Sequence, residues 1–129
     1  MNKSYIQETT VDNSAATTND NSNEYACGDT VDKVFLPSYQ DYINADYGFL
    51  AKNDLSDTRV ATLSDYARAN GASCQTTKNY SGYYWTRSAD YSYYEYATAV
   101  GDWGHFSFAS VAIEADCVRP CMNIKISNI

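Results

Sequence analysis

The chain has 129 residues, with 44% hydrophobic residues, 19% charged residues and a formal net charge of −7 at pH 7. This length allows one domain, and the apolar content is enough for a modest core, which excludes a wholly disordered chain. No apolar run approaches the roughly 18 residues of a membrane span. Nine Lys and Arg spread along an acidic chain do not form the basic face that binding to nucleic-acid phosphates requires.

The chain contains 13 tyrosines but only four phenylalanines and two tryptophans. Its N-terminal sequence lacks the apolar stretch of a signal peptide. We therefore expect a cytosolic protein, one exported by another route, or one cut from a longer precursor.

The four cysteines are too few for a disulfide scaffold. Cys117 and Cys121 lie in a segment predicted as a strand, so their Cα atoms would be roughly 13 Å apart. That is too far for a disulfide bond. If any pair is bridged, Cys27 with Cys74 is as good a candidate as another, but four ordinary buried thiols are expected.

Residues 8–24 contain one valine and no larger apolar side chain. Such a stretch cannot offset its ordering entropy by burial, so residues 1–24 are predicted to be a flexible lead-in and 25–129 a single domain. The apolar run in 33–36 precedes Pro37, which suits the end of a strand.

Two short helices are expected next. Ser38 and Asp41 have the spacing of a capping box, and Gly48 would end that helix. Thr62 and Asp65 repeat the pattern, with Gly71 after the second helix.

From residue 80 onward, aromatic and β-branched residues predict strands over 83–87, 94–100, 105–113 and 118–126. Residues 101–104 supply turn chemistry between two of them. Short helices followed by an antiparallel meander of three or four strands indicate an α+β fold.

No residue pattern indicates catalysis or a resident cofactor. His105 is the only histidine, and it lacks the strand-turn-helix context of a nucleophile elbow; a strand-surface or hydrogen-bonded core role is expected. Zinc would need four paired Cys or His ligands, and Cys27 and Cys74 have no partner nearby in sequence. The acidic pairs Asp54/Asp57 and Glu114/Asp116 are expected to be solvated loop charges, with a calcium site as the alternative. No metal site is therefore predicted.

Seven of the 13 tyrosines fall within residues 79–96, interleaved with Ser, Gly, Asn and Asp. This composition is typical of an adaptable binding surface. The predicted contacts with a ligand are Asp90, Tyr91, Tyr93, Tyr94, Asp102 and Trp103. The alternative is that the tyrosines only pack a sheet face: Tyr83, Trp85 and Arg87 would share one face of a strand, and Tyr84 and Thr86 the other.

Four ordered blocks carry a resemblance. They are Asp32–Ser38 (DKVFLPS), Thr62–Ala67 (TLSDYA), Tyr84–Ser88 (YWTRS) and Val118–Pro120 (VRP). They resemble the signature blocks of an uncharacterised domain-of-unknown-function family, number 6273, common in Firmicutes. The resemblance covers about residues 29–126.

That family is distantly similar to the C-type-lectin-like fold of the formylglycine-generating enzymes. The resemblance implies structural roles for Trp85, Arg87, Arg119 and Pro120, with the Arg119 guanidinium buried and held by hydrogen bonds or a carboxylate. Cys117 replaces the family's glycine before Val-Arg-Pro. The enzymes' closely spaced cysteine pair has no counterpart in residues 88–96, which argues against copper-dependent oxidation.

The family's early strand and tryptophan-bearing helix have no recognisable counterpart before residue 25. The resemblance then implies an open sheet edge, and we expect dimerisation through it or a low melting temperature. The Tyr-rich segment is also similar to the variable region of binding proteins from diversity-generating retroelements.

These features together predict a non-catalytic binding module of a bacterial surface or secreted protein, with a protein or glycan partner. The alternatives are a structural spacer domain, a variable retroelement protein and a remnant of a formylglycine-generating enzyme.

Overall fold

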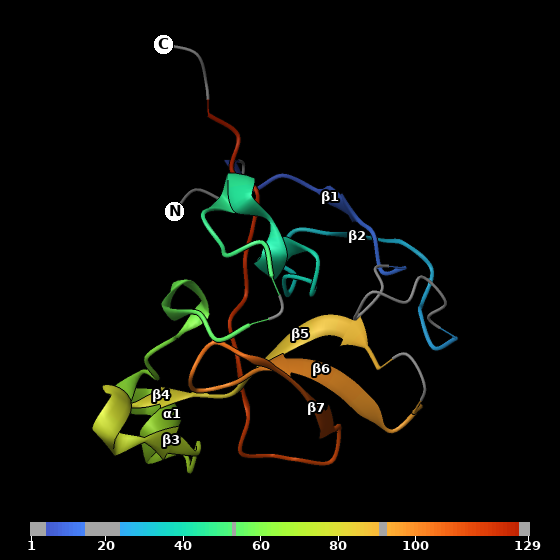
Figure 1. Cartoon of the computed structure of the whole chain (residues 1–129). Coiled ribbons are helices and arrows are strands. Elements are labelled where there is room, and N and C mark those ends of the chain that lie inside the picture. Colours follow the sequence, from blue (N-terminus) through green and yellow to red (C-terminus); the bar gives the residue numbers. More distant parts are fainter. Residues whose placement is uncertain (1–4, 15–23, 53, 91–92, 127–129) are drawn as a thin grey trace.

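The computed structural model describes residues 5–14, 24–52, 54–90 and 93–126 (Figure 1). The described part of the chain has little helix and several small sheets, so its class is α+β or mostly β. A four-stranded sheet lies in the C-terminal half of the chain. Its strands are β5 (Tyr84–Ala89), β6 (Tyr96–Val100), β7 (Phe106–Ser110) and β8 (Cys117–Val118).

The expected antiparallel meander is confirmed for β5, β6 and β7, but the expected strand over 118–126 is wrong. The strand order is β7-β6-β5-β8, and the short β8 pairs with β5 in parallel. Pro120 follows at once and has no N–H to donate to a ladder. Beyond it, residues 121–126 form the isolated bridges Phe35↔Cys121 and Ile6↔Ile124 and no further strand. In Figure 1 this red segment runs from the main sheet to the N-terminal strand.

Side chains alternate along β5 as the sequence predicts. Tyr84, Thr86 and Ser88 are buried, whereas Trp85, Arg87 and Ala89 are partly exposed. Successive side chains of a strand point to opposite faces of the sheet, so one face of β5 packs against the core and the other carries Arg87 to its partners Asp12, Leu36 and Asp41.

Tyrosines form much of the core. Tyr42, Tyr84 and Val100 make up its central cluster, and Tyr39 is also buried. The rings of Tyr42 and Tyr84 meet edge to face, with their centroids 5.5 Å apart. Phe49, Ala61, Phe106 and Cys117 pack around the cluster. Part of the tyrosine excess is therefore explained by packing.

An N-terminal strand lies within the predicted lead-in. Strand β1 (Thr9–Val11) pairs antiparallel with β2 (Thr30–Asp32), and Val11 is only 3% exposed. Ordered structure therefore begins before residue 25, because backbone pairing and one buried valine hold a stretch that is otherwise polar. The expected strand over 33–36 is reduced to the bridge made by Phe35.

The first predicted helix consists of two 3₁₀ turns, η2 (Asp41–Ile43) and η3 (Ala45–Tyr47). Its capping box is confirmed: the Asp41 N–H donates to Ser38 Oγ at 3.0 Å, and the Ser38 N–H donates to Asp41 Oδ2 at 2.8 Å. Gly48 ends η3 at φ +84°, as expected. A third 3₁₀ turn, η4 (Asp57–Arg59), follows.

The second predicted helix is α1 (Asp65–Ala69), and Gly71 follows it at φ +88°. Its N-cap is Ser64 and not Thr62, since the Ala67 N–H donates to Ser64 Oγ at 3.2 Å. Strands β3 (Cys74–Gln75) and β4 (Ser81–Gly82) form a two-stranded ladder around the 3₁₀ turn η5 (Thr76–Lys78).

Replacing Ser64 with alanine should remove this cap and lower the free energy of unfolding by about 1 kcal/mol. Thr62→Ala is the matched control, because the Thr62 hydroxyl only accepts a 3.3 Å bond from the exposed Asn79 amide. We expect the control to change stability by less than about 0.5 kcal/mol. Urea unfolding of both variants measures the difference. Equal losses of stability would show that the Ser64 hydroxyl contributes no more than the Thr62 hydroxyl.

All four cysteines carry free thiols in this structure. Cys27 is exposed, and the other three are partly buried. The expectation of four buried thiols is therefore wrong for Cys27, which lies in the connection between β1 and β2.

Candidate functional site

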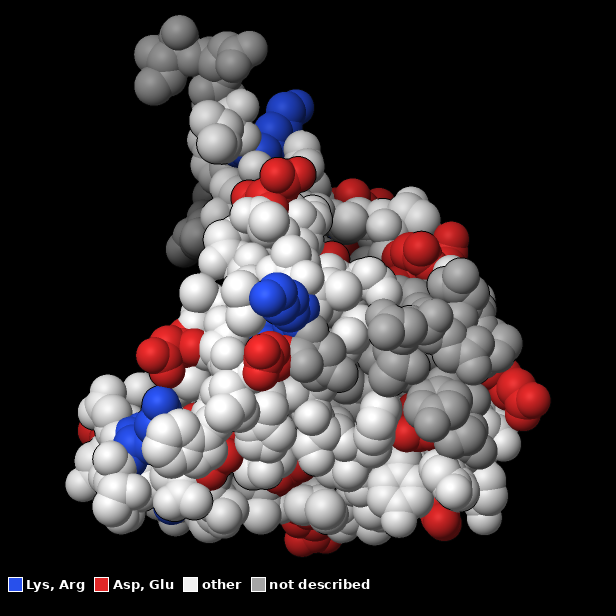
Figure 2. Space-filling model, in the orientation of Figure 1, with Lys and Arg blue, Asp and Glu red and all other residues white. Residues whose placement is uncertain are grey.

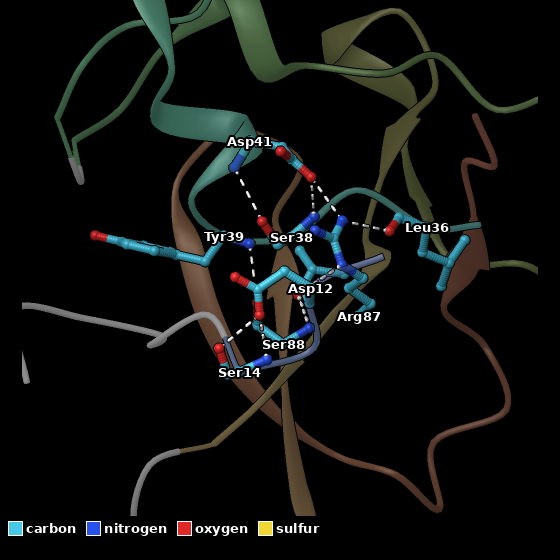
Figure 3. Close-up of polar contacts among 9 residues, drawn as sticks. Asp12, Ser14, Leu36, Ser38, Tyr39, Asp41, Arg87 and Ser88 are labelled. Carbon is cyan, nitrogen blue, oxygen red and sulfur yellow. Dashed lines mark hydrogen bonds and ion pairs between the residues drawn. The ribbon is translucent and has the colours of Figure 1, made fainter. Parts of the chain in front are cut away.

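Arg87 joins three segments of the chain (Figure 3). Its Nη1 donates to Asp41 Oδ2 at 2.6 Å and to the Leu36 carbonyl at 3.0 Å, and its Nε donates to the Asp12 carbonyl at 3.1 Å. Nearby, the Tyr39 N–H donates to Ser88 Oγ at 3.0 Å. The Arg87 contacts attach β1 and the η2 turn to the outer face of β5, and the Ser88 contact holds the segment before η2 on its buried face.

A pocket of about 500 Å³ lies beside this network. Its lining comes from β1 and Asp12, the segment from Phe35 to Phe49, residues 119–123 of the C-terminal segment and Arg87. This volume is within the range of small-molecule sites. The first and last parts of the described chain thus form a concave site that sequence reasoning did not find.

Arg119 and Pro120 lie on the wall of this pocket and are exposed. The expected burial of Arg119 is therefore wrong. Its Nη1 donates to the Tyr84 hydroxyl at 3.4 Å, its guanidinium lies 5.6 Å from the Tyr84 ring centroid, and among the described residues it forms no ion pair. The segment after β8 leaves the sheet, which carries this side chain out of the core.

The buried arginine is Arg59, which has no exposed surface. Nε donates to the Gly104 carbonyl at 2.8 Å, Nη1 to the carbonyls of Leu50 and Tyr42 at 2.9 and 3.2 Å, and Nη2 to the Asp54 carbonyl. Burial lowers the pKa of Arg59. The sequence holds no signal for this role, since an arginine in a polar loop normally reaches solvent.

Two of the predicted contact tyrosines are exposed. Tyr93 is 60% exposed and its ring meets that of Tyr96, and Tyr94 is 78% exposed and its ring meets that of Tyr25. We call these four residues the tyrosine surface. The predicted contact Tyr91 lies outside the described residues. Tyr25 comes from the connection before β2, and no pattern in the sequence pairs it with Tyr94.

The two predicted acidic contacts are buried. Asp90 is 2% exposed and its Oδ1 accepts from the Tyr93 N–H at 2.9 Å, and Asp102 is 7% exposed. Asp90 thus holds the backbone of the turn that presents Tyr93. Neither carboxylate is available on the surface as a ligand contact, because each packs inside a turn at an end of β6.

Trp103 lies apart from the tyrosine surface. It is 46% exposed, with Lys78 Nζ 4.0 Å from its ring centroid. The five-residue strand β6 separates it from Tyr94, and at about 3.3 Å per residue this is roughly 16 Å. The structure therefore does not bring the five predicted contacts that it describes into one site.

His105 is partly buried and belongs to the turn before β7. Its Nε2 lies 3.3 Å from the Tyr83 hydroxyl, while its buried Nδ1 has no hydrogen-bond partner among the described residues. Its ring packs over Gly101, where a Cβ would come within 2.2 Å of it. His105 thus packs in the turn and not on the expected strand, and its Nδ1 lacks, within the described chain, the hydrogen bond expected of a core histidine.

Within residues 5–14, 24–52, 54–90 and 93–126, no group of three or more His, Cys, Asp or Glu is placed to hold a metal ion. The same residues include no helix of the length and apolarity needed to cross a membrane. Figure 2 shows acidic side chains scattered over one face of the molecule with few basic ones between them.

These features define a small α+β or mostly β domain with an exposed tyrosine surface and a separate pocket of mixed polarity. The chain belongs to the family described as Domain of unknown function (DUF6273), whose model matches residues 1–126. The match includes the segment before residue 25, which the four sequence blocks had left out. No curated protein and no solved structure matches the chain significantly.

Proposed function

We propose that the chain is a non-catalytic binding module of a bacterial surface or secreted protein, and that it contacts a protein or glycan through the tyrosine surface. The observation that carries this proposal is the exposure of Tyr93 and Tyr94, at 60% and 78%. Tyr39, Tyr42 and Tyr84 of the same chain are at most 3% exposed. Exposed tyrosines provide large contact area with a hydroxyl for orientation and little entropy loss.

The turn that carries these rings supports the proposal. The Asp90 carboxylate accepts from the Tyr93 N–H at 2.9 Å, and the Asp90 N–H donates to the Tyr96 carbonyl at 3.1 Å. A turn held by its own hydrogen bonds loses less entropy on binding than a free loop. A C-type-lectin-like fold is part of the proposal and rests on the resemblance of the four sequence blocks, and the edge-mediated dimer stays a prediction.

The test compares the wild-type chain with the double variant Tyr93→Ser/Tyr94→Ser on glycan and bacterial-protein arrays, followed by affinity measurement on each hit. Loss of two contact tyrosines should weaken binding at least about 30-fold. The control is Tyr66→Ser on α1, because Tyr66 is 80% exposed and lies on a different element; it should bind like the wild type.

Unchanged melting temperatures would show that the variants are folded. Equal binding by the double variant and the wild type would contradict the proposal. Absence of any hit with folded wild-type protein would favour a structural spacer domain.

A further inference from the structure

The pocket between β1 and the C-terminal segment differs from the tyrosine surface in its chemistry. Two arginines and two aspartates line it together with apolar and aromatic side chains. Its ligand preference therefore depends on which of these charges are already paired within the protein.

Arg87 and Asp41 are paired with each other. Arg87 Nη1 lies 2.6 Å from Asp41 Oδ2, and the same oxygen accepts from the Ser38 N–H at 2.8 Å. Arg87 also donates to the carbonyls of Leu36 and Asp12. Asp12 in turn accepts two bonds from Ser14, at 2.8 and 2.5 Å. These charges hold the pocket wall in place and are largely satisfied without a ligand.

Arg119 is in the opposite situation. It contributes one long hydrogen bond of 3.4 Å to the Tyr84 hydroxyl, and no carboxylate of the described residues lies within ion-pair distance. A guanidinium has five N–H donors in a planar fork that matches a carboxylate. Most of these donors are available at the pocket wall.

Tyr42 supplies a second polar group. Its side chain is 2% exposed, and its hydroxyl lies close to that of Tyr84 without the geometry of a hydrogen bond. Burial, and after it the neighbouring Tyr84, raise the pKa of Tyr42, so the hydroxyl stays protonated. Arg119 and Cys121 line the same pocket. A buried hydroxyl that makes no well-formed hydrogen bond can donate to a ligand.

We propose that this pocket binds a small organic monoanion, a carboxylate joined to an apolar or aromatic group. Arg119 pairs with the carboxylate, and the Tyr42 hydroxyl donates to the ligand. Phe35, Phe49 and Val11 line the pocket and contact the apolar part. Arg119 is one unpaired positive charge and matches one negative charge on a ligand. A phosphate dianion would be repelled by the carboxylates of Asp12 and Asp41, and Arg119 would offset only one of its two charges.

The test titrates the full chain with phenylacetate, with its neutral analogue phenylacetamide and with inorganic phosphate, and follows amide chemical shifts by NMR. Phenylacetate should bind at least about 10-fold more tightly than either of the other probes. Shifts should concentrate at residues 35, 42, 87 and 119–123.

Three variants assign the roles. Arg119→Gln should remove the preference for phenylacetate, and Arg119→Lys should keep part of it because the charge remains but the fork is lost. Tyr42→Phe should weaken phenylacetate binding several-fold, because the donor to the ligand is lost, and a cooperative melting curve checks that the variant is folded. Arg68→Gln on α1 is the control and should bind like the wild type.

A smaller pocket of about 270 Å³ is lined by Arg119 but not by Tyr42. Weaker phenylacetate binding by Tyr42→Phe would therefore assign the ligand to the pocket that Tyr42 lines. No shift in the pocket at high millimolar phenylacetate, equal binding of the amide, or a preference that survives Arg119→Gln would each overturn the proposal. Phosphate binding as tight as phenylacetate would overturn the monoanion assignment. Loss of partner binding through the tyrosine surface would leave this result unaffected, because the two sites share no residue.

Discussion

Replacing Arg59 with glutamine should lower the free energy of unfolding by at least about 3 kcal/mol, because hydrogen bonds from a charged donor each contribute about 1.5–3 kcal/mol. The guanidinium is fully buried and donates to four backbone carbonyls. It also lies 4.8 Å from the ring centroid of Phe106. Glutamine is shorter and has two N–H donors, so several buried carbonyls would lose their partner. Urea unfolding followed by circular dichroism measures the change.

The carbonyls that Arg59 binds come from distant parts of the chain. Gly104 is 45 residues away along the sequence and Tyr42 is 17 residues away. In addition, the Arg59 carbonyl accepts from the Tyr84 hydroxyl at 2.5 Å. One residue thus connects the turn before β7, the η2 turn and β5, so its loss should affect the whole domain and not a local segment.

Two further variants test this explanation. Arg59→Lys should also be strongly destabilised, since an ammonium group cannot reach carbonyls in different directions as the guanidinium fork does. Arg68→Gln should be far less destabilising, because its ion pair with Asp65 and its contact with the Tyr80 ring are at the surface. An Arg59→Lys variant as stable as the wild type would show that charge alone, and not the fork, is required.

Replacing Gly104 with alanine should be the second most damaging single change. Gly104 has φ +73°, and a Cβ at this position would lie 1.8 Å from the Ser56 carbonyl oxygen. The backbone conformation costs a non-glycine residue roughly 1–2 kcal/mol, and forcing Ser56 away should add about 1–3 kcal/mol. The Gly104 carbonyl also accepts from Arg59 Nε, so a shift of the backbone at Gly104 would weaken this hydrogen bond.

Gly71→Ala provides a matched control. Gly71 has φ +88°, but a Cβ there would meet no atom within 4 Å. Both substitutions carry the penalty of the left-handed backbone, and only Gly104→Ala adds the collision. Urea unfolding should therefore show a loss of about 1 kcal/mol for Gly71→Ala and at least twice that for Gly104→Ala. Equal losses would show that Ser56 moves aside freely.

The sequence predicted the features that depend on neighbouring residues. The Ser38 and Asp41 capping box, the glycines at 48 and 71 and the alternation along β5 are each set by chemistry within a few positions. The exposure of Tyr93 and Tyr94 also agrees with the expected loop cluster. Such local patterns indicate where elements begin, end and turn.

The features that were missed depend on long-range contacts. Strand β1 is polar in sequence and is ordered by backbone pairing with β2, about 20 positions later. Nothing in the sequence singles out Arg59, because its carbonyl partners are backbone groups that leave no mark on the sequence. Arg119 was expected inside the core because its block resembles a sheet strand, whereas Pro120 turns the chain out of the ladder.

The proposed anion pocket is walled by residues 9–12 and 119–123, which are among the first and the last described residues of the chain. The Gln7 N–H donates to the Asn123 carbonyl at 2.9 Å, and the Lys125 N–H donates to the Tyr5 carbonyl at 2.8 Å. Bringing together segments so far apart in the sequence costs more chain entropy than pairing the neighbouring strands of the β5–β7 meander. A ligand held between these two segments would offset part of that cost and stabilise the folded chain.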